Sequence, residues 1–208
     1  RGSEPVKLLH TSDWHVGKAI RGRSRADEHR AVLAEIAAVA DQRDVDLVIV
    51  AGDLFDTASP TAESEAIVYR ALLDLATGGR PVVVVAGNHD SRPNRRAIKA
   101  TPGVTALHNT VVDVDGVTIA GFDDPVITTA DPVPRYEREA VELAAAPEVS
   151  ELLGRERPDV LAVHNPVIVA HREVHHVPDR DAVARGGFNN NRSFFNGANG
   201  HDGHLRLV

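Results

Sequence analysis

The stretch DLVIVAG, residues 46–52, is an uninterrupted apolar run that ends in a glycine and is followed by Asp53. Because apolar and polar residues do not alternate in it, the run predicts a β-strand that is buried on both faces. Two further runs have the same character, VKLLH at residues 6–10 and PVVVVAG at residues 81–87. Together these stretches predict three central strands of one sheet.

Amphipathic segments separate the three runs. Residues 26–43 predict a helix whose apolar face consists of Val32, Leu33, Ile36, Val39 and Ala40. A second helix should begin near residue 59, with Ser59 as its N-cap and Pro60 in its first turn. Its expected apolar face is Ile67, Ala71, Leu72 and Leu75. The order strand, helix, strand, helix, strand is typical of an α/β fold, a parallel sheet with helices on both faces.

The second half of the chain is less regular. Residues 111–122 alternate around Asp115-Gly116, which predicts a hairpin. A helix over about 135–154 and a strand over 159–165 should follow. Residues 171–208 show little periodicity, and they are expected to be a loop region of uncertain order. No internal repeat and no linker is evident, so we expect residues 1–208 to form a single domain.

Composition limits the classes of protein to consider. The chain has 208 residues, no cysteine and a formal net charge of −7. No apolar run approaches the roughly 18 residues of a membrane span, and we find no signal-peptide pattern. We therefore expect a cytoplasmic protein, with RGS at residues 1–3 left from expression. The negative charge argues against extensive coating of a polyanion, although arginines gather in RGRSR (21–25) and SRPNRR (91–96).

Residues that could bind a metal follow each predicted strand. Since parallel strands bring their carboxyl ends to one edge of a sheet, these side chains should converge there. They are Asp13 and His15, Asp53, Asn88 with His89 and Asp90, and His164 with Asn165. His201 and His204 lie near the C-terminus.

The mixture of donor types indicates which metal to expect. Carboxylate, imidazole and amide oxygen without sulfur favour manganese, iron or zinc. Asp53 is central among the strands, and its two oxygens could bridge two ions. Two such ions about 3.5–4 Å apart form a clamp for in-line displacement at phosphorus and activate a bridging water.

The motifs TSDWHVGK, GDLFD, GNHD and VHNP resemble those of the calcineurin-like metallophosphoesterases. Over residues 6–90 the chain is most similar to the SbcD branch, the bacterial nuclease subunits related to eukaryotic double-strand-break repair nucleases. The resemblance implies a β-sandwich core of mixed, largely parallel sheets flanked by helices. It also implies two divalent ions, Mn²⁺ first and Fe²⁺ or Zn²⁺ as alternatives, and hydrolysis of phosphodiester bonds in DNA, as an exonuclease or endonuclease.

The resemblance implies a role for each motif residue. Asp13 and His15 would bind one ion, Asp53 would bridge, and Asn88 and His164 would bind the other. His89 would protonate the leaving oxygen, with Asp90 orienting it. Family members close the site with a G-H-x-H motif. Here the nearest match is GHDGH, residues 200–204, which would supply His201 and His204 as ligands, with His171, His175 and His176 as competitors.

Other functions stay open at this point. The middle of the chain looks more like generic bacterial metallophosphoesterases, and the C-terminal DNA-binding region of SbcD is absent, so the chain is expected to be truncated or divergent. A nucleotide, a phosphoprotein or another small phosphoester could be the substrate instead of DNA. A catalytically weak module that binds an ATPase partner is a further alternative. The resemblance implies an SbcC-like ATPase subunit as partner, and a homodimer is possible.

Overall fold

The computed structural model describes residues 6–128, 135–165, 167–170 and 206–207. Their order is β1 (Leu8–Ser12), β2 (Ala19–Ile20), β3 (Arg23–Ser24), α1 (Ala26–Gln42), β4 (Leu47–Gly52), α2 (Ala62–Leu75), a 3₁₀ turn (Thr77–Gly79), β5 (Val82–Ala86), α3 (Arg92–Lys99), β6 (Val104–Leu107), β7 (Thr110–Val114), β8 (Val117–Phe122), α4 (Arg135–Glu156), β9 (Val160–Val163), α5 (Val167–Ala170) and β10 (Arg206–Leu207).

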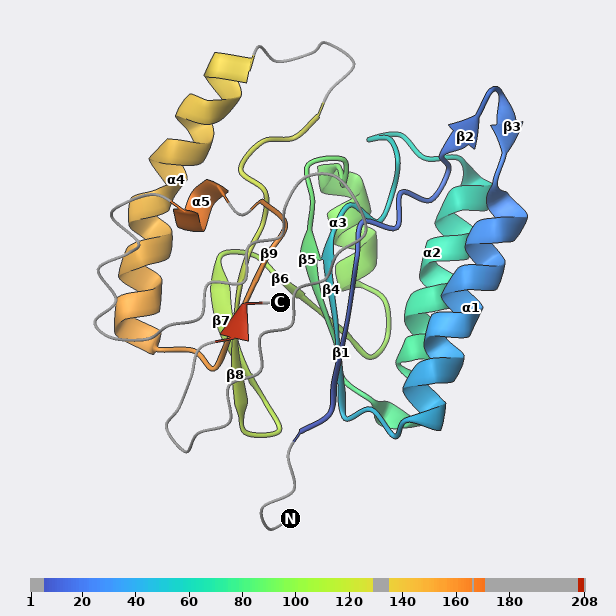
Figure 1. Ribbon diagram of the computed structural model, residues 1–208, viewed down its shortest axis with the longest axis horizontal. Helices are drawn as coiled ribbons and strands as arrows, with labels where there is room; N and C mark the ends of the chain where they lie inside the picture. The colour runs from blue at the N-terminus through green and yellow to red at the C-terminus, as the bar shows by residue number, and fades with distance from the viewer. Residues whose placement is uncertain (1–5, 129–134, 166, 171–205, 208) are drawn as a thin grey trace.

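Two four-stranded sheets form the core (Figure 1). The first has the order β1-β4-β5-β6, and all its neighbouring strands are parallel. The second has the order β10-β9-β8-β7, with β7 and β8 antiparallel and the other pairs parallel. A small antiparallel ribbon, β2-β3, stands apart from both. The fold is the mixed, largely parallel sandwich that the resemblance implies.

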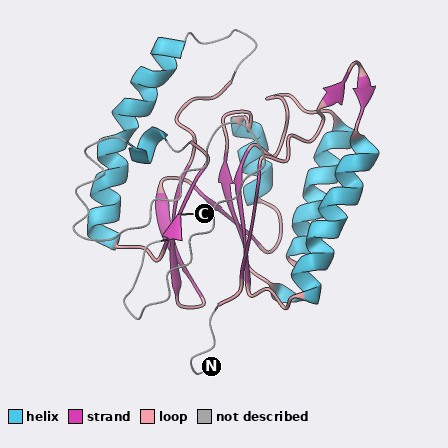
Figure 2. Ribbon diagram, viewed as in Figure 1, coloured by secondary structure: helices cyan, strands magenta, loops and turns pink. Residues whose placement is uncertain are grey.

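Alternate residues of the central strands face different layers. Leu47, Ile49 and Ala51 of β4 pack toward the second sheet in one apolar cluster, which includes Ile119 of β8 and Ala162 of β9. The intervening residues of β4 pack against α1, α2 and α3 in a second cluster. A third cluster joins the outer face of the second sheet to α4 and α5. The molecule is therefore built in four layers, helices, sheet, sheet and helices (Figure 2).

The expectation of helices on both faces of the first sheet is wrong. Helices cover only its outer face, and the second sheet covers the other. A strand that is buried on both faces has the same continuous apolar sequence whether a helix or a sheet lies over it, so sequence pattern alone could not distinguish the two.

The predicted helices form, with two local corrections. In α1, Leu33 and Ala40 are buried as expected, but Val32 and Val39 are exposed, because the buried face is rotated toward Ala37. The N-cap of α2 is Thr61 and not Ser59: the Thr61 hydroxyl accepts the N–H of Ser64. The whole predicted apolar face of α2 is buried.

The hairpin predicted at Asp115-Gly116 joins β7 and β8. Both residues have positive φ angles, 52° and 87°, as a tight two-residue connection requires. Because β8 runs parallel to β9, its carboxyl end lies at the same edge of the sandwich as that of β9. Among the described residues, none of the helices is both long and apolar enough to cross a membrane.

Candidate metal centre

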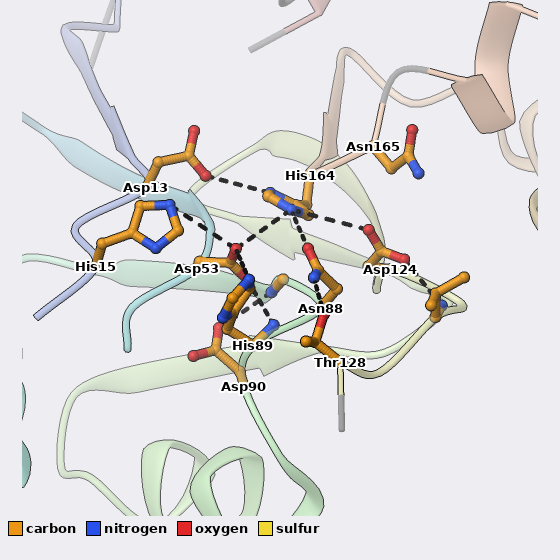
Figure 3. A network of polar contacts seen from close by, with 12 residues as sticks. Asp13, His15, Asp53, Asn88, His89, Asp90, Asp124, Thr128, His164 and Asn165 are labelled. Atoms are coloured by element: carbon orange, nitrogen blue, oxygen red, sulfur yellow. Dashed lines mark hydrogen bonds and ion pairs between the residues drawn. The ribbon is translucent and has the colours of Figure 1, made fainter. Parts of the chain in front are cut away.

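The motif side chains converge beyond the carboxyl ends of β1, β4, β5 and β9 (Figure 3). Asp13, Asp53 and His164 each present a potential ligand atom, and these atoms lie within 4.8 Å of one another. The topology explains the convergence, because β1, β4 and β5 are parallel neighbours in one sheet and β9 ends at the same edge in the other.

The loop after β1 is held against the loop after β4. The N–H of His15 donates to the carbonyl of Asp53 at 3.1 Å, and Val16 pairs with Phe55. Asp13 and His15 both have left-handed backbones, with φ of 51° and 45°. Non-glycine residues rarely adopt this conformation, and it often marks functional loops. In this loop the His15 ring lies 3.9 Å from Oδ2 of Asp53, and the Asp13 carboxylate lies 3.3 Å from Nδ1 of His164.

Asp53 is the centre of the cluster and is only 2% exposed. Its Oδ2 lies 3.9 Å from Nε2 of His15, 3.8 Å from Nε2 of His89 and 3.7 Å from Nε2 of His164. Its Oδ1 accepts the backbone N–H of His89 at 2.8 Å. One carboxylate oxygen therefore faces three imidazoles from three different loops.

His164 lies between two groups of oxygens. Its Nδ1 is 3.3 Å from Oδ1 of Asp13, and its Nε2 is 3.0 Å from Oδ1 of Asn88. Burial by itself lowers the pKa of His164. The hydrogen bond to Asp13 and the charges of Asp53, Asp13 and Asp124 outweigh this effect and raise the pKa above its usual value. Carboxylates thus outnumber the cations in the cluster, and a positive charge is favoured there.

Two residues of this centre were missed by sequence reasoning. Asp124 lies just after β8, and its Oδ2 is 3.8 Å from Nε2 of His164. Thr128 accepts a hydrogen bond from the side-chain amide of Asn88, which directs the amide oxygen toward His164. The rule that identified the other residues, a polar group after a strand, also applies to GFDD at 121–124. The alternating pattern of that strand, however, indicates only one half of a hairpin.

Asp90 does not have the orienting contact expected of it. Its carboxylate accepts the backbone N–H groups of Leu54, Phe55 and Gly87 at 3.0–3.3 Å, and so ties the loops after β4 and β5 together. Burial raises the pKa of Asp90 to about 7, and these N–H groups oppose the shift.

Asp56 supplies the contact instead. Its carbonyl oxygen lies 2.7 Å from Nδ1 of His89, and its carboxylate lies 3.5 Å from Nδ1 of His15. Each ring therefore has its Nδ1 against Asp56 and its Nε2 facing Asp53.

Gly52 and Gly87 leave space for the side chains of the cluster, and this space is relevant to whether the site could hold a metal. A Cβ on Gly52 would lie 2.5 Å from Oδ1 of Asp13 and 2.7 Å from Nδ1 of His164, and Gly52 has φ of +112°. A Cβ on Gly87 would lie 2.1 Å from Oδ1 of Asp53. The absence of a side chain at both positions thus allows the carboxylates of Asp13 and Asp53 and the ring of His164 to lie close together. The negative charge of these carboxylates exceeds the positive charge beside them. This donor set, oxygen and imidazole nitrogen, fits a divalent ion.

Some predicted site residues lie outside the described part of the chain. They are His201 and His204, together with the competing His171, His175 and His176. Their contribution to the centre stays a prediction.

Two members of the arginine clusters form ion pairs with other described residues, and two are exposed. Arg25 pairs with Glu28 at 2.7 Å, and Arg95 pairs with Asp123 at 2.6 Å. Arg21 and Arg23 lie exposed on the β2–β3 ribbon.

A cavity of about 550 Å³ adjoins the cluster. It lies between α3 and α4, has Phe122 and Val149 in its apolar lining, and shares Asp124 with the cluster. Arg92, Arg96 and Lys99, one turn apart on α3, also line it and are exposed. The cavity therefore combines apolar walls with a cationic side.

The proteins to which this chain is similar include several nuclease subunits. It is 45% identical over 91 residues to the SbcD subunit of the SbcCD nuclease of Bacillus subtilis, covering 43% of this chain and 23% of that protein. The corresponding subunit of Escherichia coli K12 is 36% identical over 129 residues, 62% of this chain and 30% of that protein. The corresponding subunit of Rhodobacter capsulatus is 36% identical over 105 residues, which cover 50% of this chain and 26% of that protein. The chain thus spans less than a third of the length of these relatives.

A solved structure, TT1561 of Thermus thermophilus, matches 76% of this chain and 80% of its own with a TM-score of 0.47. The two sequences are 16% identical, and this similarity is too distant to inform function. The model of the calcineurin-like phosphoesterase family matches residues 6–200. The chain therefore belongs to the calcineurin-like phosphoesterases, a family of metal-dependent hydrolases.

Proposed function

We propose that this chain hydrolyses phosphodiester bonds in DNA with two divalent ions, Mn²⁺ first among them. The observation that carries the proposal is the position of Asp53, whose Oδ2 faces His15, His89 and His164 at 3.7–3.9 Å. In the proposed arrangement, Asp13 and His15 hold one ion, Asn88 and His164 hold the other, and Asp53 serves both. His201 and His204 would add further ligands.

When bound, the two ions would supply Lewis-acid activation of water and neutralise charge that develops at phosphorus. The protein's own residues handle the proton. With Nδ1 held against the Asp56 carbonyl, His89 directs Nε2 toward the cluster, where it donates a proton to the leaving oxygen. Asp90 keeps the loops after β4 and β5 in register, so that Asp53 and His89 stay opposed.

DNA is favoured as substrate by two features. The similar proteins of B. subtilis and E. coli carry the name of a nuclease, and the cationic side of the cavity offers phosphate contacts beside the cluster. A role in DNA repair, an SbcC-like ATPase partner, a homodimer and a cytoplasmic location belong to this proposal on the same resemblance. The cavity itself also suits a small phosphoester such as a nucleotide, because apolar walls with a few charged groups are typical of small-molecule sites.

The test compares two substrates at a fixed metal concentration, linear double-stranded DNA and a small chromogenic phosphodiester. The variant replaces Arg92, Arg96 and Lys99 by alanine, and a second variant replaces Arg21 and Arg23. In the variant whose basic residues contact DNA, we expect DNA cleavage to fall at least about 10-fold while cleavage of the small diester persists. The dependence of DNA binding on salt concentration should also weaken, with its logarithmic slope falling by roughly one per lost phosphate contact.

The matched control replaces Arg43 and Arg157, which are exposed and follow α1 and α4, by alanine. It should leave both activities unchanged. Equal losses on both substrates in the α3 variant would favour the small-phosphoester function, and turnover of neither substrate by the metal-loaded wild type would favour the binding module.

A further inference from the structure

Two buried polar side chains meet next to His164. Glu142 lies on α4 and is 5% exposed, and Asn165 directly follows His164 and is 6% exposed. The side-chain amide of Asn165 donates to Oε1 of Glu142 at 2.7 Å. Burial of a carboxylate and an amide costs free energy, and apolar residues of similar size in place of a buried charged group are often at least as stable. Packing alone therefore does not account for these two residue types.

The Glu142 carboxylate is held on its own helix as well. Arg138, one turn earlier on α4, has its Nε 3.7 Å from Oε1 of Glu142. Beyond this pair, α4 packs against the second sheet through apolar side chains, among them Ala146 and Val149. The carboxylate is thus fixed to a packed helix, and its hydrogen bond to Asn165 connects that helix to the residues that follow β9.

Asn165 and the proposed ligand His164 occupy consecutive positions but have different surroundings. Nδ1 of His164 lies 3.3 Å from Oδ1 of Asp13, and its Nε2 lies 3.0 Å from Oδ1 of Asn88. The Asn165 amide lies away from these groups, as Figure 3 shows. Because one planar peptide joins the two residues, an anchored Asn165 side chain restricts the backbone that carries the His164 ring.

We propose that Glu142 and Asn165 are positioning residues, which hold the imidazole of His164 in place for a metal ion without contacting the ion themselves. This inference rests on the proposed two-metal function. It gives α4 a part in the centre comparable to that of Asp90, which anchors the loops after β4 and β5 through their backbone N–H groups. The hydrogen bond between Glu142 and Asn165 opposes a displacement of the His164 ring from Asn88.

The first experiment measures Mn²⁺ binding by the full chain after a chelator has removed bound metal. The wild type should bind two ions, and Glu142→Leu should weaken the binding of one of them by about 10–100-fold, the usual effect of losing a group that orients a metal ligand. Glu142→Gln should restore most of this affinity, because its amide oxygen can still accept the N–H of Asn165. The matched control is Glu151→Leu, the same substitution at an exposed position of α4, which should keep both ions.

A double-mutant cycle shows whether Glu142 acts through His164. His164→Ala should lower the Mn²⁺ affinity by itself. Adding Glu142→Leu to it should then cause little further loss, because the effects of residues that act through one another are not additive. A further loss as large as the one that Glu142→Leu causes alone would contradict the inference.

NMR of the metal-free protein separates positioning from a general structural role. The imidazole ¹⁵N signals of His164, assigned with His164→Ala, should shift in Glu142→Leu and return in Glu142→Gln. The signals of His89, which follows β5 in the other sheet, should stay in place. Asn165→Ser, whose side chain is too short to reach Glu142, carries the same expectations if Glu142→Leu does not fold.

The outcomes distinguish this inference from the proposed function. Unshifted His164 signals, or equal shifts of His89 and His164, would overturn the inference and leave the two-metal function standing. A wild type that binds no Mn²⁺ would overturn the proposed function, and the His164 signals would still decide whether Glu142 and Asn165 position this ring.

Discussion

The sheet formed by β1, β4, β5 and β6 supplies five of the proposed site residues, Asp13, His15, Asp53, Asn88 and His89, whereas the sheet formed by β7 to β10 supplies Asp124 and His164. The first set is fixed by bonds within its own loops, such as those that Asp90 accepts. The second set reaches the cluster across the sandwich. The candidate metal centre therefore consists of a locally fixed half and a half whose position depends on how the two sheets meet.

Asp53→Ala should have the largest effect, because Asp53 faces both halves. If the proposed function holds, we expect loss of both ions and a fall in turnover of more than about 10⁴-fold, because two such ions would supply most of the charge stabilisation at phosphorus. Elemental analysis of the purified variant together with steady-state kinetics measures both. Retention of one tightly bound ion would show that Asp53 belongs to one half only.

His89→Ala should separate proton transfer from metal binding within the first half. Turnover should fall by about 10²–10⁴-fold with both ions retained, because a proton donor is lost and no ligand is. The control is Asp56→Ala, which keeps the carbonyl that holds the His89 ring but loses the carboxylate beside His15. It should weaken metal binding more than His89→Ala does. The opposite ranking would contradict the assigned roles.

Arg95→Met should lower the free energy of unfolding, because it removes the contacts that connect the two halves. The Arg95 guanidinium donates to the carbonyls of Gly87 and Asp90 in the first half and to Asp123 in the second, at 2.6–3.0 Å. Breaking a largely buried ion pair costs about 3 kcal/mol, which urea denaturation would detect. Arg92→Met, on the exposed side of the same helix, should stay within about 0.5 kcal/mol of wild type. Equal stabilities of the two variants would refute the assigned role of Arg95.

Asp159→Asn should have the smallest effect, at the end of the second sheet away from the cluster. The hydroxyl and N–H of Thr118 both donate to Asp159 and lower its pKa. A lowered folded pKa adds stability above the unfolded value of about 3.9, and this is lost as the pH falls through the folded pKa. After solvent screening the difference at pH 7 should be at most about 0.5 kcal/mol, and it should disappear in acid. A difference that persists at pH 2 would exclude a charge effect.

The first half of the centre could be predicted from sequence, and the second only in part. Continuous apolar runs located β4 and β5 closely, and the residues after them followed from the rule for parallel strands. The location of His164 followed from the same rule. The location of Asp124 could not be predicted by this rule. The sequence of β8 indicates only that it forms a hairpin with β7, and its alternating pattern does not show that β8 also pairs in parallel with β9. The contact of His89 with the Asp56 carbonyl could not be predicted either, because every residue has a backbone carbonyl.

The Arg95 guanidinium also bears on how the candidate centre is assembled. It joins the loop after β5, which carries Asn88 and His89, to Asp123, the residue before Asp124. Contacts within the protein therefore hold the loops of the two sheets together, so that the candidate site is preorganised and ligand binding requires less ordering of these loops.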